Sequence, residues 1–287
     1  MDLTGNMVAM LLGVGSSATL HISQVLMRLG VVGLRAGDRS LCRWAVYLTG
    51  LLLNFTAPFW VMAANLFADT LWFTSMFATG LVVSLLFSRL VLGETITRAQ
   101  TLGAVLIVAG TLLIAAAGLT GLPGRTGMLN LPLLLAVSLG WVLLMPVLGL
   151  LCRHRQLRVQ ETVFGLAAGG FLALDALWKS LSQQRFDGGV GLLPVSLDAW
   201  LFLGVSFVGA LGAFLMMQWS YWRHCRPVGV LVSYNLMYVS LPLALAGVMA
   251  LRHGVAQLNV LILSGLLLML AGGLISQSRM ALQCGKD

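Results

Sequence analysis

The chain has 287 residues, of which 59% are hydrophobic and 9% are charged, and its formal net charge is +8. A soluble domain carries roughly 25% charged residues, so this chain has too few to solvate the surface of a water-soluble globule. The composition argues against a soluble enzyme, a disordered chain and a secreted disulfide scaffold. It indicates a polytopic membrane protein.

Nine apolar segments are long enough to cross a bilayer, which takes about 20 residues in a helix. In chain order they run over 7–30, 44–66, 70–92, 99–119, 128–151, 159–178, 198–222, 228–250 and 256–278. The first segment lacks the short apolar core and small-residue exit of a cleaved signal peptide, so we expect it to stay as a helix. We therefore predict an all-α fold of about nine transmembrane helices, with the two termini on opposite sides of the membrane.

Lysines and arginines concentrate on one side of this predicted bundle. Thirteen of the 17 follow odd-numbered helices or lie in the C-terminal tail. Because basic loops mark the cytoplasmic side, we predict an outside N-terminus and a cytoplasmic C-terminus, in a bacterial inner membrane. The positive charge is then a topology signal near anionic lipid, and no nucleic-acid partner is expected.

The cysteines fit the same orientation. All four fall on the predicted cytoplasmic side, where thiols stay reduced: Cys42, Cys152, Cys225 and Cys284. None of them forms a CxxC pair, so no metal or redox cluster is predicted.

Two glycine-spaced segments indicate an internal repeat. TLGAVLIVAGTLLI (101–114) and LSGLLLMLAGGLIS (263–276) each carry glycines seven residues apart, and a span rich in small and polar residues precedes each. The four glycines are Gly103, Gly110, Gly265 and Gly272. Since the two segments are predicted to run in opposite directions, we expect two inverted repeats, 1–121 with four helices and 122–287 with five. As individual residues, these glycines also fit close helix packing.

The first helix has the clearest polar pattern. Five residues repeat at intervals of 4, 4, 3 and 4, which places them within a stripe roughly 80° wide: Gly13, Ser17, His21, Gln24 and Arg28. Polar side chains at membrane depth normally face the bundle or a wet cavity. We expect this stripe to face a substrate.

Other helices contribute further polar and aromatic side chains. Pro58 cannot donate a backbone hydrogen bond, so it is expected to free the carbonyl of Asn54. Thr70, Ser84 and Ser88 align with Thr74 on the third helix. The predicted substrate-binding set is Ser17, His21, Gln24, Asn54, Asn65, Thr74, Gln218, Trp222, Tyr234, Asn235 and Tyr238. For any single member, the alternative is an interhelical hydrogen bond that serves packing.

His21 is the one histidine well inside a predicted span. An imidazole gains or loses a proton near neutral pH, so His21 is our candidate for proton coupling or for hydrogen bonding to substrate. The alternative is a neutral imidazole bonded to Ser17 or Gln24.

Charged and capping residues near the helix ends have structural interpretations. Thr97 and Gln100 have the spacing of a capping box, and Glu94 would complement the same helix end. Asp175 and Lys179 are expected to form an ion pair at the membrane interface. Glu161 is expected to complement the N-terminus of its own helix.

The segment LVLGETITRAQTLGAVLIVAGTLLI (90–114) resembles the end of an EamA-type repeat of the drug/metabolite transporter superfamily. Within it, the chain is similar to the NIPA-like branch, which is associated with magnesium transport and nine predicted spans. The matching segments are GVGSSATLHISQVLMRLG (13–30), NLFADTLW (65–72) and MMQWSYWRHCRPVGVLVSYNLMYVSLP (216–242). The chain departs from the family in two places. The family's proline is absent from the segment in which Asp69 precedes Thr70 and Leu71. Arg28 ends the first helix, where the family more usually has a lysine.

This resemblance implies a secondary transporter that works by alternating access. No carboxylate lies near the middle of any predicted span, whereas magnesium favours carboxylate ligands. We therefore expect a small metabolite or an amphiphile as substrate, with a magnesium or other divalent-cation transporter as the alternative. No P-loop is present, so no cofactor is expected and a proton or substrate gradient would drive transport. A membrane enzyme is disfavoured because paired carboxylates are lacking. Expected partners are the substrate and the bilayer, and a homodimer stays open.

Overall fold

The chain is an all-α polytopic membrane protein. A computed structural model describes residues 3–37, 40–93, 95–119, 130–184, 190–252 and 260–278. Eight helical segments in these ranges are long and apolar enough to cross a bilayer, and a shorter apolar helix covers Val260–Ser276. Together they coincide with the nine predicted spans, so the predicted fold class is confirmed.

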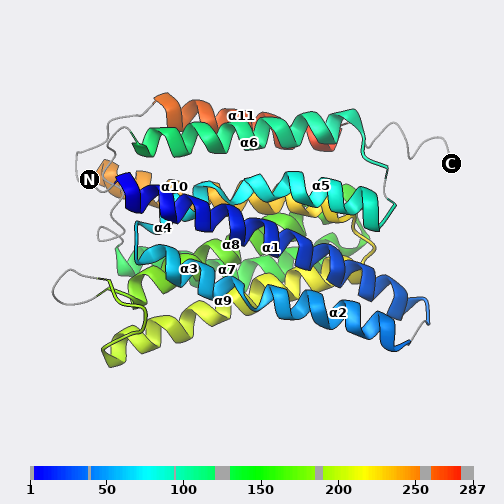
Figure 1. Cartoon of the computed structure of the whole chain (residues 1–287), viewed down its shortest axis with the longest axis horizontal. Helices are drawn as coiled ribbons and strands as arrows, with labels where there is room; N and C mark the ends of the chain where they lie inside the picture. Colours follow the sequence, from blue (N-terminus) through cyan, green and yellow to red (C-terminus); the bar gives the residue numbers. More distant parts are fainter. Residues whose placement is uncertain are drawn as a thin grey trace.

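The elements follow one another as long helices joined by short connections (Figure 1). Their bounds are α1 Leu3–Arg35, α2 Leu41–Asn54, α3 Ala57–Asn65, α4 Thr70–Ser75, η1 Phe77–Thr79, α5 Gly80–Val91, α6 Arg98–Leu119, α7 Leu131–Leu151, η3 Cys152–His154, α8 Leu157–Ser182, α9 Leu197–Trp222, α10 Pro227–Arg252 and α11 Val260–Ser278.

Two of the predicted spans are interrupted helices. The second breaks between α2 and α3, where Pro58 stands in the first turn of α3 and has no backbone N–H to continue the helix. The third breaks at η1, where the Thr79 hydroxyl donates to the Met76 carbonyl at 2.7 Å. An interrupted helix at membrane depth is stable where protein covers its backbone, and the buried Phe77 and Ala78 of η1 meet that condition.

The helix α6 pairs with α11, and Figure 1 shows the two lying side by side at one edge of the bundle. Gly103 faces Gly272, and Gly110 faces Gly265, with backbone against backbone at both crossings. Because residue numbers rise along α6 while those of the facing residues fall along α11, the two helices run antiparallel. Their opposed directions are those predicted from the distribution of lysine and arginine.

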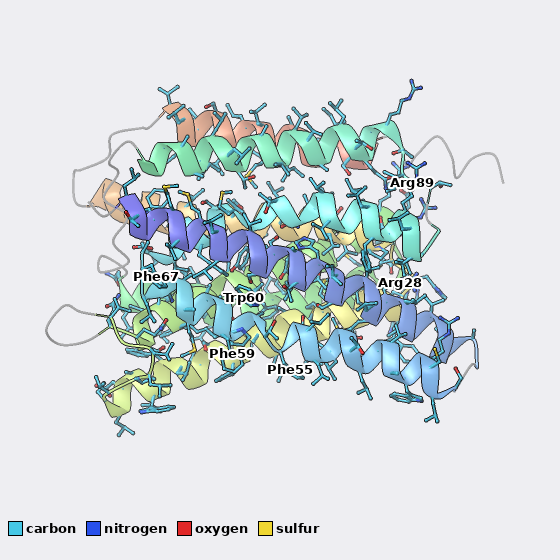
Figure 2. The ribbon with its side chains drawn as sticks, in the orientation of Figure 1. Arg28, Phe55, Phe59, Trp60, Phe67 and Arg89 are labelled. Carbon is cyan, nitrogen blue, oxygen red and sulfur yellow. The ribbon has the colours of Figure 1, made fainter. Side chains whose placement is uncertain are left out.

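One end of the bundle gathers the arginines, and we call it the basic end: it is where α1, α5, α7 and α9 finish and α2, α6, α8 and α10 begin (Figures 1 and 2). The predicted capping box is confirmed there, since the Thr97 backbone N–H donates to Gln100 Oε1 at 2.9 Å and the Gln100 N–H donates to Thr97 Oγ1 at 3.2 Å. Glu94 lies outside the described residues.

Glu161, which was predicted to complement its own helix, accepts a hydrogen bond at the start of another one. Its Oε1 accepts the backbone N–H of Arg226 at 2.7 Å, just before α10 begins at Pro227. A carboxylate at a helix N-terminus is favourable because that end of the helix is partly positive. Glu161 therefore complements α10, because the fold brings the starts of α8 and α10 together.

Candidate functional site

The centre of the candidate site is a contact between α1 and α10. His21 and Asn235 are both fully buried, and His21 Nε2 lies 2.9 Å from Asn235 Nδ2. The second amide hydrogen of Asn235 goes to the Leu231 carbonyl at 2.7 Å. Because Nδ2 donates in both bonds, His21 Nε2 accepts.

The other ring nitrogen fixes the protonation state of His21. Nδ1 lies 2.7 Å from the Ser17 carbonyl, which accepts only, so Nδ1 carries the hydrogen. The assignment follows from the hydrogen-bond network, and it describes a neutral imidazole with one donor and one acceptor in use. The Ser17 part of the alternative interpretation is confirmed, whereas Asn235 and not Gln24 is the second partner.

Ser17 joins α1 to the interruption of the third span. Its hydroxyl donates to the Phe77 carbonyl and accepts the backbone N–H of Gly80 at 3.0 Å. A Cβ at position 80 would collide with both the Ser17 hydroxyl and the His21 ring. Glycine is therefore required for this close approach, and the break at η1 supplies the backbone groups that Ser17 uses.

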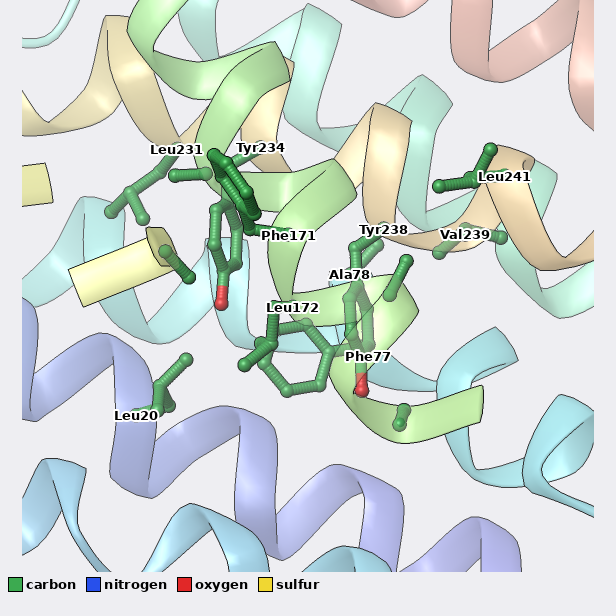
Figure 3. Packing of buried hydrophobic residues seen from close by; sticks show 14 of the residues in the cluster. Leu20, Phe77, Ala78, Phe171, Leu172, Leu231, Tyr234, Tyr238, Val239 and Leu241 are labelled. Carbon is green, nitrogen blue, oxygen red and sulfur yellow. The ribbon is translucent and has the colours of Figure 1, made fainter. Parts of the chain in front are cut away.

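Three aromatic rings pack together beside the histidine, and one of them, Phe77, contacts its imidazole. The Phe77 ring lies 5.6 Å from His21, 6.0 Å from Tyr234 and 4.3 Å from Tyr238, measured between centroids. The two tyrosine rings are parallel at 6.2 Å. Figure 3 shows Phe77 beside Tyr238, with both tyrosine hydroxyls directed to the same side of α10. These aromatic rings and the neutral imidazole form an apolar wall with polar edges.

Several polar atoms around this wall are buried and have no hydrogen-bond partner: Gln24 Oε1, Asn235 Oδ1 and Tyr238 Oη. An unsatisfied buried acceptor or hydroxyl costs about 1–3 kcal/mol, so such a group in a native structure needs an explanation. A ligand that supplies the missing partners is one.

The structure brings six of the eleven predicted site residues together: Ser17, His21, Gln24, Tyr234, Asn235 and Tyr238. Gln218 lies nearby, because its amide contacts Met27 Sδ of α1 at 3.2 Å. Phe77 and Gly80 complete the cluster but were not predicted. Gly80 could have been predicted, because it lies in a span rich in small and polar residues. No pattern in the sequence indicated that the Phe77 ring belongs to the site.

The remaining four predicted residues lie apart from this contact. Asn65 donates to Gln183 Oε1 at 2.8 Å and accepts from Thr70 at 2.7 Å, so it ties α3 and α4 to the end of α8. Thr74 donates back to Leu71 of its own helix. Asn54 is partly exposed at the end of α2. Trp222 is 54% exposed, with Arg35 over its ring at 5.9 Å.

The predicted ion pair between Asp175 and Lys179 is confirmed, and neighbouring helices cover it. Lys179 is fully buried and Asp175 is 2% exposed. Gly209 of α9 lies against the backbone of Asp175, and the Lys179 ammonium lies 5.5 Å from the Phe207 ring centre. The helix α9 covers this face of α8, which the hydrophobicity of either helix alone does not reveal.

A hollow of about 560 Å³ lies between α1 and the interruption of the second span. Its walls are mostly apolar, and its two threonines spend their hydroxyls on carbonyls of their own helices, Thr19 on Gly15 at 2.9 Å and Thr56 on Leu53 at 2.7 Å. Such walls suit an acyl chain. The unsatisfied polar atoms of the α1–α10 contact make that contact the better candidate for a substrate.

Comparison with models of protein families, with curated proteins and with solved structures finds no match for this chain.

Proposed function

We propose that the protein is a secondary transporter of the drug/metabolite type that moves a small metabolite or an amphiphile by alternating access. The observation that carries this proposal is the buried contact between His21 and Asn235. Polar side chains are costly in a bilayer and normally mark a substrate or ion pathway. Here they are paired across helices of the two proposed inverted halves, 1–121 and 122–287.

The same contact offers a way to couple a proton to movement. A second proton on His21 would occupy Nε2 and turn that acceptor into a donor. The Asn235 amide would then face N–H with N–H, and the contact between α1 and α10 would weaken. His21 is therefore the proposed proton-coupling residue, and proton uptake favours separation of the halves.

The substrate class follows from the unpaired atoms. Gln24 Oε1 and Asn235 Oδ1 accept hydrogen bonds, Tyr238 Oη can donate, and the Phe77 and tyrosine rings provide apolar contact. A few placed polar groups on an apolar wall are typical of sites for small organic molecules. The resemblance to the drug/metabolite transporters supports this class. We place the protein in a bacterial inner membrane with the basic end in the cytoplasm, because basic loops stay there.

Transport by the purified protein in proteoliposomes tests the proposal. With an internal pH dye and an imposed pH gradient, we expect substrate-dependent proton flux from at least one metabolite of a panel. Asn235→Leu should reduce the flux at least tenfold. Asn54→Leu is the matched control, because Asn54 is a membrane-segment asparagine apart from the contact, and its flux should be retained.

Two outcomes would contradict the proposal. Equal flux in wild type and Asn235→Leu would separate the site from transport. Saturable uptake of Mg²⁺ without proton movement, and without competition from any metabolite, would favour the divalent-cation alternative.

A further inference from the structure

Arg28, Arg35 and Arg223 lie near the ends of α1 and α9, at the basic end. The side chains of Arg35 and Arg223 are hydrogen-bonded within the protein. Arg35 donates to the Trp222 carbonyl. Arg223 donates to the Arg153 carbonyl and lies 3.4 Å from Gln160 Oε1. Arginines that bond the last carbonyls of a helix stabilise its partly negative end. These two side chains therefore have structural roles.

Arg28 is different. It lies about two turns before α1 ends, on the stripe with His21 and Gln24, and its Nε is buried without a hydrogen-bond partner. A guanidinium has five N–H donors and no acceptor. A buried donor on a charged group that finds no partner points to a ligand that supplies an acceptor.

A second orphaned group stands beside it. Tyr221 of α9 is fully buried, its hydroxyl has no partner, and Arg28 is close enough for its charge to act on that hydroxyl. Two unpaired donors, one of them positive, thus lie on two helices that contact each other, α1 and α9. Together they match a carboxylate or phosphate group, which accepts bonds from both.

Among the described residues, the acidic side chain at the basic end is that of Glu161, and it is already hydrogen-bonded. Glu161 accepts from the Arg226 N–H, and its other oxygen lies against Gly229 in the first turn of α10. The Glu161 carboxylate therefore lies at the start of α10. Among the described residues, the Arg28 site keeps an excess of positive charge.

The spacing of the polar residues along α1 indicates how long the ligand is. At about 1.5 Å of rise per residue, Gln24 is about 6 Å and His21 about 10 Å from Arg28 along α1. Two of the unpaired atoms near these levels are acceptors, Gln24 Oε1 and Asn235 Oδ1. A molecule that satisfies both levels has an anionic group at one end and a hydrogen-bond donor, such as a hydroxyl or amine, about 6–10 Å away.

We propose that Arg28 and Tyr221 bind the carboxylate or phosphate of a soluble organic anion, whose donor end reaches Gln24 and Asn235. This inference rests on the proposed function and names its substrate class. Binding is measured at equilibrium without transport. If anions bind but no flux is found, only the transport proposal fails; if flux is found for an uncharged or cationic substrate that does not need Arg28, only this inference fails.

The test is thermal unfolding of the full chain in a non-ionic detergent, titrated with glycerol 3-phosphate, succinate, dihexanoyl phosphatidic acid and, as a cation, choline. A ligand that binds only the folded state raises the melting temperature. We expect a saturable rise with a soluble anion and none with choline. Arg28→Gln should weaken the apparent affinity at least tenfold, whereas Arg35→Gln, the matched control, should leave it unchanged.

Tyr221→Phe provides a variant that folds. It removes a hydroxyl with no partner in the protein, so the ligand-free melting temperature should stay the same or rise while anion affinity falls at least threefold. Equal loss of affinity in Arg28→Gln and Arg35→Gln would overturn the proposal, because it would mean non-specific attraction to the basic end. A response to dihexanoyl phosphatidic acid alone would overturn the soluble source and assign the site to a lipid headgroup.

Discussion

Gly103 and Gly272 meet with their backbones in contact where α6 crosses α11. A Cβ built on either residue would lie 2.5 Å from the carbonyl oxygen of the other. Gly110 and Gly265 repeat this relationship. The two antiparallel helices thus pack through reciprocal contacts. Glycine at these crossings lets the backbones approach, which is how helices associate within a bilayer.

Gly272→Ala should therefore destabilise the protein. Its Cβ would meet the Gly103 carbonyl and Ile107 Cγ1 at 2.9 Å, and overpacking of this kind costs about 1–3 kcal/mol. Gly273→Ala is the matched control, because its Cβ would meet only Leu236 at 3.7 Å and alanine favours a helix over glycine. Thermal unfolding in detergent should show a fall for the first variant and no fall for the second. Equal melting temperatures would contradict the packing of α6 on α11.

The nine spans could be predicted because membrane helices are set by length and hydrophobicity, which are local properties of the chain. The opposed directions of α6 and α11 followed from counting basic residues. The helix breaks at Phe55–Thr56 and at η1 could not be predicted from length and hydrophobicity. Pro58 indicated a freed backbone carbonyl, but whether a helix bends or breaks there depends on the protein that covers it.

The stripe on α1 predicted half of the candidate site, because helical period alone puts Ser17, His21 and Gln24 on one face. The partner of this stripe on α10 was harder to predict. Asn235 was predicted as a site residue, yet its bond to His21 spans 214 positions of the chain, and no periodicity reports such a distance. Burial of Asp175 and Lys179 likewise depends on α9, which packs against α8 from a distant part of the chain.

Gly80→Ala should disturb the centre of the site. Its Cβ would collide with the Ser17 hydroxyl and the His21 ring, so either α1 or α5 must move. We expect a loss of about 1–3 kcal/mol in stability and at least a tenfold loss of flux. Gly204→Ala, in α9, has nothing within 4 Å of its Cβ and should be at least as stable as wild type. Normal flux in Gly80→Ala would show that transport does not need this contact.

Cysteine reactivity should distinguish two of the thiols at the basic end, Cys42 and Cys225. Burial raises the pKa of the Cys225 thiol to about 12, so little thiolate forms at pH 7–9. Because the thiolate is the nucleophile, the alkylation rate of a variant that keeps only Cys225 should rise about tenfold per pH unit through this range. A variant that keeps only Cys42, which is exposed, should react faster at every pH. A rate for Cys225 that levels off below pH 9 would contradict its buried position.

The Asp175–Lys179 pair predicts a non-additive mutant cycle. Removing one partner leaves the other charge buried inside the bundle, which costs about 3–5 kcal/mol. Replacing both with apolar residues leaves no charge to desolvate, so Asp175→Leu combined with Lys179→Met should be more stable than either single variant. Thermal unfolding of the four proteins in detergent measures this coupling. If the double variant loses the sum of the two single losses, the side chains do not act as a buried pair, and α9 does not cover them as the structure describes.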